Sequence, residues 1–266
     1  MSNQPRVAAV IVTHNSQNFI EQTLHSIEDQ SHPAQIRIAV DDHSSDATSD
    51  LLSHGGFTVV RATSAADDTT TRIAQNFHQA FREAVEQGAD LVVLGDHDDV
   101  WHRDRIEYQV DLLQQHTHIA MLASDGFLID EHSAALPGTI RSNFPVPSDF
   151  NTRTPSAQLR YAVRHSIATG GASALRPAAL SDWAVPAGWL HDRWWSLVAL
   201  RAGRLWLDPS PVIDYRVSPN QQVGLNTSQQ QAPGRWIVSK AQRFGSSASR
   251  VRDLARLSGT GTQAGS

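Results

Sequence analysis

The chain contains no cysteine, a single lysine and no long apolar run, and each shortage excludes something. Without cysteine there is no disulfide, no thiolate nucleophile and no zinc site built from thiolates. No stretch approaches the roughly 20 consecutive apolar residues that a membrane-spanning helix needs. The segment Met1 to Val12 lacks the basic start and apolar core of a secretory signal, so we expect a cytoplasmic protein, with peripheral contact at the inner face of the membrane left open.

Positive charge comes almost entirely from arginine, because Lys240 is the only lysine. The formal net charge is -5, which gives no overall attraction to nucleic acid, and we expect no nucleic-acid partner. With 266 residues, of which 40% are hydrophobic, the chain can form one substantial core. The sequence leaves the oligomeric state open.

The first half of the chain alternates between apolar runs and amphipathic segments. The apolar runs, which are typical of buried strands, are Val7 to Val12, Ile36 to Val40, Phe57 to Arg61, Leu91 to Leu94 and Ile119 to Ala123. The clearest helices between them are Ile73 to Gln87, which Gly88 should end, and Arg103 to His116. This alternation predicts an α/β fold with a doubly wound, mostly parallel central sheet flanked by helices.

The second half of the chain is less regular. Gly138 to Thr154 is rich in Pro, Ser and Asn and predicts a loop, whereas Gln158 to His165 and the Trp-rich segment Leu190 to Ala202 predict helices. Two short strands are expected at Leu205 to Leu207 and Val212 to Arg216. We expect a single domain over residues 1–220, with an extension over 221–266 whose end, from Ser258, is disordered.

Polar residues follow three of the predicted strands. They are Thr13 to Asn15, Asp41 with Asp42, and Asp96 to Asp99. Parallel sheets bind ligands at the carboxyl ends of their strands, and all three clusters should lie there. The turn after the first strand has no G-x-G-x-x-G motif, which disfavours an NAD-type dehydrogenase.

The cluster Asp96 to Asp99 contains three carboxylates directly after a buried strand. Like charges this close repel one another, and a divalent cation suits their hard oxygens. Such a cation could bridge a diphosphate and neutralise charge on a leaving phosphate. The alternative is that these aspartates cap the next helix and pair with Arg103 or Arg105. Three carboxylates at the end of a central strand favour the metal.

A family resemblance rests on three segments in order: Val10 to Asn15, Val40 to Thr48 and Leu94 to Trp101. With the pattern D-x-D-D-I/V-W in the last of them, they resemble the family 2 glycosyltransferases, and most of all a rhamnosyltransferase-like branch. The similarity extends from Val7 to Arg216. It implies a GT-A fold, a nucleotide-sugar donor, Mn²⁺ or Mg²⁺, and inversion at the anomeric carbon. It further implies a nucleotide-binding part over residues 1–125 and an acceptor-binding part over 126–220.

The resemblance also implies roles for individual residues. The nucleotide and donor would be bound by Thr13, His14, Asn15, Asp41, Asp42 and Asp96. The metal ligands would be Asp98, as the principal one, and Asp96, with Asp99 in the same loop. Capping of the following helix is the alternative for Asp41 and Asp42, and it is the better explanation of Asp46. A surface or capping role is the alternative for His14.

Two further segments resemble the family in the second half. Ser124 to Asp130 resembles the strand that lines the acceptor side, which implies an acceptor contact for Asp125; a turn or helix cap is the alternative. Thr169 to Ala172 resembles the segment that passes the donor sugar. There Gly170 and Gly171 would let the backbone approach a ligand, or would simply form a turn.

The segment His191 to Trp195 resembles the H/E-D pair of the family, in which the aspartate is the catalytic base. Inversion by direct displacement needs one group that takes the proton of the acceptor hydroxyl, and this role would belong to Asp192. The alternative for Asp192 is a helix N-cap. The resemblance places His191, Trp194 and Trp195 on the acceptor side, where the two indoles could stack on a sugar, although core packing suits at least one of them.

The chain departs from the family at Ser218. Related sequences read Y-R-x-H where this chain has Tyr215 to Ser218, and their histidine completes the metal shell or contacts the diphosphate. Serine is a poor substitute for imidazole, so metal affinity or activity could be altered. Arg216 could still pair with a phosphate.

Three functions remain in competition. The leading one is an inverting glycosyltransferase that uses a UDP- or dTDP-sugar, dTDP-rhamnose among them, and a glycan or lipid-linked acceptor in surface polysaccharide synthesis. The second, which Ser218 motivates, is a non-catalytic nucleotide-sugar binding protein. The third is a metal-dependent phosphohydrolase, which leaves Val40 to Thr48 without explanation.

Overall fold

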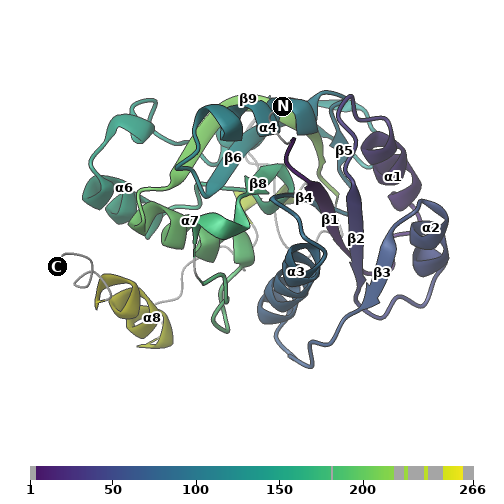
Figure 1. Ribbon diagram of the computed structural model, residues 1–266, viewed down its shortest axis with the longest axis horizontal. Coiled ribbons are helices and arrows are strands. Elements are labelled where there is room, and N and C mark those ends of the chain that lie inside the picture. Colours follow the sequence, from purple (N-terminus) through teal and green to yellow (C-terminus); the bar gives the residue numbers. More distant parts are fainter. Residues whose placement is uncertain (1–3, 181, 219–224, 227–236, 239–247, 260–266) are drawn as a thin grey trace.

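The computed structural model describes residues 4–180, 182–218, 225–226, 237–238 and 248–259 (Figure 1). Its strands are β1 (Val7–Thr13), β2 (Ile36–Asp41), β3 (Thr58–Arg61), β4 (Leu91–Asp96), β5 (Val100–Trp101), β6 (Met121–Ile129), β7 (Ala135–Thr139), β8 (Ser173–Leu175), β9 (Leu205–Arg216), β10 (Leu225–Asn226) and β11 (Ile237–Val238). Its α-helices are α1 (Ile20–Glu28), α2 (Thr48–His54), α3 (Thr69–Glu86), α4 (Arg105–Gln115), α5 (Ile140–Asn143), α6 (Pro155–Ala162), α7 (His191–Arg201) and α8 (Ala248–Gly259). Short 3-10 helices are η1 (Phe150–Thr152), η2 (Gly170–Ala172) and η3 (Pro177–Ala179).

The central sheet has the strand order β3-β2-β1-β4-β8-β6-β9-β5, with β7 paired to β6. Its longer ladders, β1 with β2 and β4, β2 with β3, and β6 with β9, are parallel. The short strand β8 runs antiparallel between β4 and β6. The predicted doubly wound, mostly parallel sheet flanked by helices is therefore confirmed.

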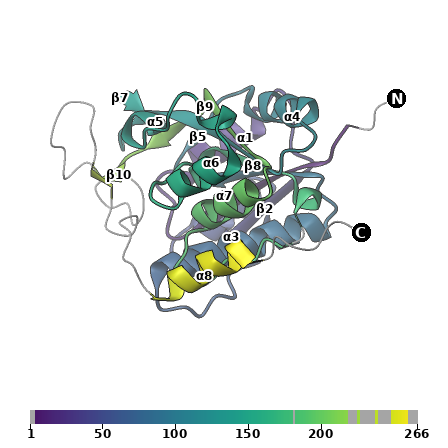
Figure 2. The same ribbon diagram turned by 90° about the vertical axis from the view of Figure 1, so that its left-hand side faces the viewer.

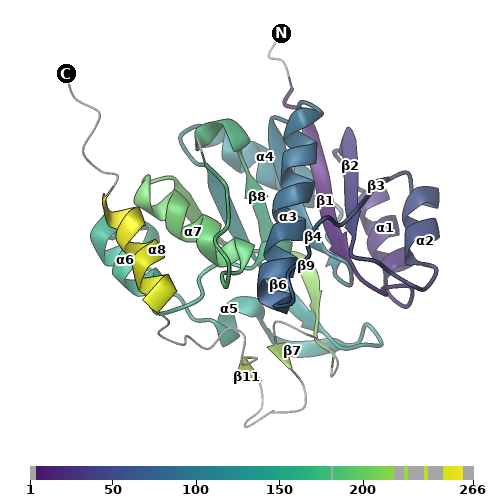
Figure 3. The same ribbon diagram turned by 90° about the horizontal axis from the view of Figure 1, so that it is seen from below.

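Helices cover both faces of this sheet (Figures 1 and 3). On one face α3 and α7 pack with Phe77, Phe81 and the indoles of α7 in one hydrophobic cluster. On the other face α1, α2 and α4 pack in a second cluster that includes Ile20, Leu52 and Ile106. The side view in Figure 2 shows α6 directly above α7, with which it packs. Among the described residues, no helix combines the length and apolarity needed to cross a membrane.

The local sequence explains the elements that position the site. Every residue of β1 is buried, as expected for a strand with parallel neighbours on both sides and helices on both faces. The side chain of Asp68 caps α3 by accepting a hydrogen bond from the Thr71 amide, so this helix begins before the predicted Ile73. It ends at Glu86, and Gly88, the predicted stop, follows the C-cap residue Gln87 with a φ of +84°.

Two predictions for the second half are corrected. The expected loop from Gly138 to Thr154 contains α5, η1 and the end of β7. The two expected short strands form one strand, β9, whose pairing with β6 shifts register near Asp125. The shift lies opposite Pro209 and Pro211, which have no amide hydrogen to donate to the ladder.

The predicted domain boundaries stay predictions. The proposed division near residue 125 falls inside β6, so both parts would share one strand. Of the extension expected over 221–266, the structure describes β10, β11 and α8. Ser258 and Gly259, for which disorder was predicted, are the last residues of α8, and residues 260–266 lie outside the described part of the chain.

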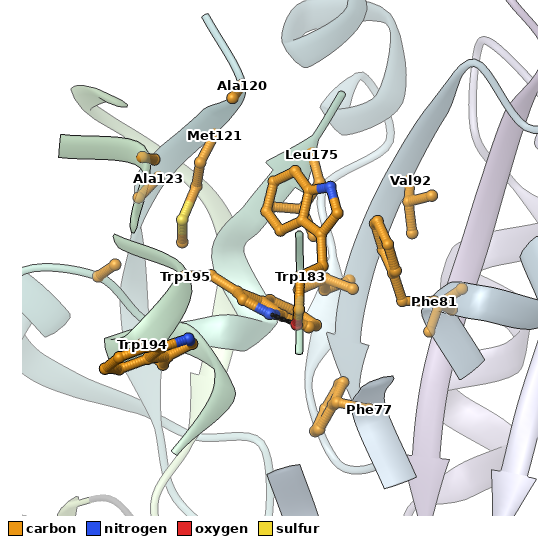
Figure 4. Packing of buried hydrophobic residues seen from close by; sticks show 14 of the residues in the cluster. Phe77, Phe81, Val92, Ala120, Met121, Ala123, Leu175, Trp183, Trp194 and Trp195 are labelled. Carbon is orange, nitrogen blue, oxygen red and sulfur yellow. Dashed lines mark hydrogen bonds between the residues drawn. The ribbon is translucent and has the colours of Figure 1, made fainter. Parts of the chain in front are cut away.

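The indole rings of Trp194 and Trp195 in α7 pack in the hydrophobic core (Figure 4). Trp195 is fully buried, and its ring nitrogen donates to the carbonyl oxygen of Trp183 at 2.7 Å. Its ring meets that of Trp183 edge-on, with centroids 5.8 Å apart. Trp194 is also buried, and its ring lies 5.3 Å from that of Trp189. This packing joins α7 to α3 and so holds the helix that begins at His191 and Asp192.

We expect Trp195→Ala to lower the free energy of unfolding by about 3–5 kcal/mol, because it leaves a large cavity in the core and removes a buried hydrogen bond. Trp206→Ala is the matched control, since this indole is only partly buried and stacks on His116 at the surface. We expect it to cost less than half as much in the same urea titration. Equal losses from both substitutions would contradict the assignment of Trp195 to the core.

Candidate functional site

A cavity of about 370 Å³ lies at the carboxyl end of the sheet. This volume falls within the range of small-molecule sites. The loops after β1, β2 and β4 contribute to its wall, and so do α3, α5 and the amino end of α7. The lining residues are Val12, Thr13, His14, Asn15, Asn18, Phe19, Asp42, Arg72, Ile73, Phe77, Asp96, His97, Asp98, Ile140, Phe144, Thr169, Gly170, Leu190, His191, Asp192, Tyr215 and Ser218.

Hydrogen bonds join the loop after β1 to the loop after β2. The Nδ1 atom of His14 lies 2.6 Å from the carbonyl oxygen of Asp42. The side-chain oxygen of Asn15 accepts from the Ser45 amide at 2.8 Å. Asn15 adopts a φ of +48°, a left-handed conformation that asparagine tolerates better than most residues. These bonds make one rigid wall from residues that are about 30 positions apart in sequence.

Asp41 and Asp42 have different surroundings. Asp41 does not line the cavity; its carboxylate accepts from the hydroxyl groups of Thr13 and Ser44 and so organises the turn after β2. Asp42 does line the cavity, and Nε of Arg72 donates to it at 2.9 Å. Asp41 thus organises the turn through its Oδ1 atom, and the ligand role predicted for it stays a prediction.

The acidic loop divides its carboxylates between the cavity and the interior. Asp96 and Asp98 line the cavity, whereas Asp99 does not and is fully buried. One oxygen of Asp99 accepts from the backbone amide of Arg216 at 3.0 Å. Nε of Arg216 donates to the carbonyl oxygen of Asp98 at 2.8 Å. Asp99 and Arg216 thus clamp the loop to the end of β9.

Arg216 does not line the cavity, which corrects the predicted phosphate contact. Its guanidinium also donates to the side chain of Gln22 at 2.7 Å and to the carbonyl oxygen of Asp130 at 2.9 Å. It lies over the ring of Phe19 at 4.9 Å. Because these groups surround it, this arginine orients the acidic loop from behind.

Gly171 makes room for the buried carboxylates. A Cβ at this position would lie 2.7 Å from Oδ2 of Asp96 and 2.7 Å from Oδ2 of Asp99. Gly171 does not line the cavity, so the predicted close approach of its backbone to a ligand is corrected to a close approach to these two carboxylates. Gly170, its neighbour, does line the cavity.

Burial and neighbouring negative charge raise two pKa values in the loop. Burial first, and then the charges of Asp98 and Asp192, raise the pKa of Asp96 to about 7 against the lowering effect of Arg105. Burial, with the charges of Asp98 and Asp96, raises the pKa of Asp99 well above its usual value. Arg105 is itself fully buried, and burial lowers its pKa to about 9. Its guanidinium stacks on Trp101 at 3.9 Å and donates to the carbonyl oxygen of Leu94 at 2.6 Å.

The residues at the cavity fit a divalent cation that is shared with a ligand. Within the described part of the chain, no cluster of three or more His, Cys, Asp or Glu side chains could hold a metal ion by itself. Asp98 and Asp96 nevertheless present hard oxygens to the cavity, side by side in one loop. Mg²⁺ in nucleotide sites is typically bound by one or two carboxylates, with waters and phosphates completing its shell.

Asp192, in the first turn of α7, lines the same cavity as Asp96, and its charge acts on that carboxylate. The residue at the N-cap is Leu190, so Asp192 is not the cap. Its carboxylate accepts from the amides of Gly170 at 3.2 Å and Arg193 at 2.6 Å. Burial raises the pKa of Asp192 to about 6 even though both hydrogen bonds lower it. A carboxylate with this pKa can accept a proton near neutral pH.

Three residues predicted on the acceptor side lie away from the cavity. Asp125 is buried and accepts from the amides of Gly126 and Arg141, so the alternative of a turn or helix cap describes it. Trp194 and Trp195 belong to the core and do not line the cavity, which corrects the predicted sugar-stacking wall. His191, the fourth acceptor-side residue, lines the cavity, and so does Ser218.

Other lining residues were not anticipated. Arg72, Ile73 and Phe77 come from α3, whose amphipathic pattern indicated only a core helix. Ile140 and Phe144 come from α5 and its end, within a segment predicted as a loop. The only signal in the sequence was that Arg72 directly precedes the predicted helix, where a side chain can be exposed near the strand ends. The apolar part of the cavity wall is formed by tertiary packing, which no short sequence motif predicts.

The fold is the GT-A fold of glycosyltransferases. TarS of S. aureus (residues 1–349, in complex with UDP) superposes with a TM-score of 0.57 at 18% identity, covering 80% of this chain and 61% of that one. Glucosyl-3-phosphoglycerate synthase of Mycobacterium tuberculosis, in complex with Mn²⁺, UDP and glucosyl-3-phosphoglycerate, superposes with a TM-score of 0.52 at 18% identity, covering 80% of this chain and 72% of that one.

Sequence similarity gives the family. The sequence model of Glycosyl transferase family 2 matches residues 8–182, and the chain belongs to this family. A relative in Bacillus subtilis (strain 168), the putative teichuronic acid biosynthesis glycosyltransferase TuaG, is 31% identical over 134 residues, which are 48% of this chain and 52% of the relative. The chain thus matches about half the length of that relative.

We expect Mn²⁺ and UDP together to raise the melting temperature of the wild-type protein, and we expect Gly171→Ala to abolish this stabilisation, because the added methyl group pushes apart the carboxylates of the acidic loop. The substitution should itself cost about 1–3 kcal/mol through overpacking. Gly55→Ala is the control, since its methyl group would meet mainly the flexible side chain of Leu24. Normal stabilisation of the Gly171→Ala protein by Mn²⁺ and UDP would contradict this account of the loop.

Proposed function

We propose that the protein transfers a sugar from a UDP- or dTDP-activated donor, of which dTDP-rhamnose is one candidate, to a hydroxyl of a glycan or lipid-linked acceptor. The reaction inverts the configuration at the anomeric carbon and contributes to surface polysaccharide synthesis. Membership of Glycosyl transferase family 2 and the GT-A fold support a glycosyltransferase. The observation that carries the proposal is that Asp192, from α7, and the pair Asp96 and Asp98, from the end of β4 and the loop after it, line one cavity.

The nucleotide occupies the part of the cavity formed by the loops after β1 and β2. Thr13, His14, Asn15 and Asp42 all line this part. Arg72, whose Nε donates to the carboxylate of Asp42 at 2.9 Å, adds a guanidinium with several hydrogen-bond donors beside this carboxylate. UDP in the TarS structure and in the glucosyl-3-phosphoglycerate synthase structure supports a pyrimidine nucleotide as the first candidate.

The diphosphate lies beside the acidic loop. Asp98, with Asp96, would hold Mn²⁺ or Mg²⁺, and this cation would offset the charge that the leaving diphosphate gains. The Mn²⁺ in the glucosyl-3-phosphoglycerate synthase complex supports the choice of metal. This chain's own contribution is to fix the loop, because Asp99 and Arg216 hold it from behind.

Asp192 is the proposed base. Its carboxylate takes the proton from the acceptor hydroxyl while that oxygen forms a bond to the anomeric carbon. The bond from the anomeric carbon to the phosphate oxygen breaks, and its electron pair leaves with the nucleoside diphosphate. The amides of Gly170 and Arg193 hold the carboxylate in place but leave it able to accept a proton.

Ser218 keeps a second function in view. It lines the cavity where the family pattern has a histidine, so the site has one strong metal ligand fewer. A nucleotide-sugar binding protein without catalytic turnover is the function that this observation favours. Binding of UDP-glucose, UDP-N-acetylglucosamine or dTDP-rhamnose without transfer or hydrolysis of any of them would select this alternative.

We expect Asp192→Asn to lower the rate of sugar transfer by about 10²–10⁴-fold, because the amide cannot take the acceptor's proton. Affinity for the nucleoside diphosphate with Mn²⁺, measured by calorimetry, should change by less than about twofold, since the proposed partner of Asp192 is the acceptor hydroxyl and not the nucleotide. Asp50→Asn, on the exposed face of α2, is the matched control and should retain full activity. Full activity of the Asp192→Asn protein would reject the base.

The pH profile gives an independent test. Asp192 works only when it is ionised, and its pKa is raised to about 6, so kcat/KM should rise with pH up to about 6 and level off above it. At one pH unit below this value about a tenth of the enzyme carries the ionised base. The acidic limb should be read from initial rates at saturating Mn²⁺. A limb centred near pH 4, the ordinary value for aspartate, would mean that another group limits the reaction.

A further inference from the structure

His191 is a buried polar group at the wall of the cavity. It is the first residue of α7, and only 5% of its surface is exposed. Neither nitrogen of its ring has a hydrogen-bond partner among the described residues. Buried polar side chains in folded proteins are nearly always hydrogen-bonded, because an unmet donor or acceptor costs free energy. A group of this kind that lines a cavity is one that a bound ligand would satisfy.

The imidazole is held in one position from three sides. It stacks on Phe77 of α3, with ring centroids 3.7 Å apart and planes 20° from parallel. Trp195 meets it edge-on at 5.2 Å. On the third side Nε2 lies over the Cα of Gly170, where any Cβ would overlap with it. Aromatic packing by Phe77 and Trp195 and a glycine at Nε2 leave the ring fixed but give it no polar partner.

The ring is neutral at physiological pH. Burial lowers the pKa of His191 to about 3, and no carboxylate opposes this effect. A neutral imidazole has one N–H donor and one nitrogen acceptor. This pair suits an alcohol hydroxyl, which donates and accepts, and it suits a phosphate or carboxylate much less, since both favour positive charge.

The position of the ring points to the donor sugar. Arg72, Ile73 and Phe77 of α3 form one wall of the cavity, which starts at the nucleotide-side residue Asp42. His191 stacks on the last of them and precedes Asp192 in the chain. The imidazole therefore lies between the nucleotide side and the base. The transferred sugar must occupy that interval, because its anomeric carbon is joined to the diphosphate and faces the base.

We propose that His191 is a specificity-determining residue that hydrogen-bonds a hydroxyl of the sugar carried by the nucleotide donor. The inference rests on the proposed function and names one contact within it. It replaces the acceptor-side role predicted from the sequence. Gly170 supports the contact, since a side chain there would displace the ring.

The test compares nucleotides with and without their sugar. Calorimetry with Mn²⁺ measures the affinities of UDP and dTDP beside UDP-glucose, UDP-N-acetylglucosamine and dTDP-rhamnose. We expect the preferred donor to lose about five- to tenfold in affinity in His191→Phe, which keeps the stacked ring but has no polar atom. The affinity for the matching nucleoside diphosphate should stay within about twofold, since it lacks the sugar. His191→Gln, whose amide can reach the position of Nε2, should recover part of the loss.

Controls separate this contact from a structural role. His165→Phe replaces an exposed histidine outside the cavity and should change neither affinity. Each variant's melting temperature shows whether it folds. Donor analogues that lack one hydroxyl each identify the partner: the wild-type protein should bind one analogue weakly, and His191→Phe should bind that analogue as well as the complete donor.

Several results would overturn the inference. One is equal weakening of nucleotide and nucleotide-sugar by His191→Phe, and another is unchanged discrimination among the analogues in that variant. A wild-type protein that binds UDP or dTDP but binds no sugar-bearing form more tightly would overturn it while leaving the nucleotide site intact. A wild-type protein that binds none of these nucleotides would instead reject the proposed function itself, and the inference with it.

Discussion

Burial of several carboxylates around one cavity is the constraint on which the rest of the structure depends. Asp96, Asp99 and Asp192 are largely withdrawn from water, and burial is the largest cause of the raised pKa of each. Buried carboxylates destabilise the folded protein unless neighbouring groups compensate their charge, because desolvation of a charge costs free energy. Arg105 stacks on Trp101, which follows the acidic loop, and Arg216 donates a hydrogen bond to the loop backbone. These two arginines stabilise the buried carboxylates.

The topology of the sheet explains why these groups meet. In a parallel sheet the carboxyl ends of β1, β2 and β4 share one edge. The antiparallel strand β8 comes from this edge, since Ala174 pairs with Val93 in the middle of β4 and the residues before Ala174 run toward the carboxyl end of β4. The 3-10 helix η2 therefore places Gly170 and Gly171 directly beside the acidic loop. An all-parallel order would have carried the start of that strand to the opposite edge.

The two glycines of η2 make room for different side chains. Gly171 accommodates the carboxylates of Asp96 and Asp99, and Gly170 accommodates the imidazole of His191 while its amide binds Asp192. A single turn thus sets the spacing between the side of the cavity that holds negative charge and the side that holds the base. Trp195 and Phe77 complete the arrangement by packing against the imidazole and joining α7 to α3.

The sequence by itself determined the strand and helix order of the first half, the three polar clusters at strand ends and the family, because these depend on local periodicity and contiguous motifs. Only the tertiary structure decided which polar groups face the cavity. Asp41, Asp125 and Arg216 have the chemistry of ligands, yet their atoms are engaged by neighbouring loops and elements. Trp194 and Trp195 lie on a helix that is buried where a binding wall was expected. Whether a side chain binds a ligand or holds a loop depends on partners distant in sequence, and a motif does not record them.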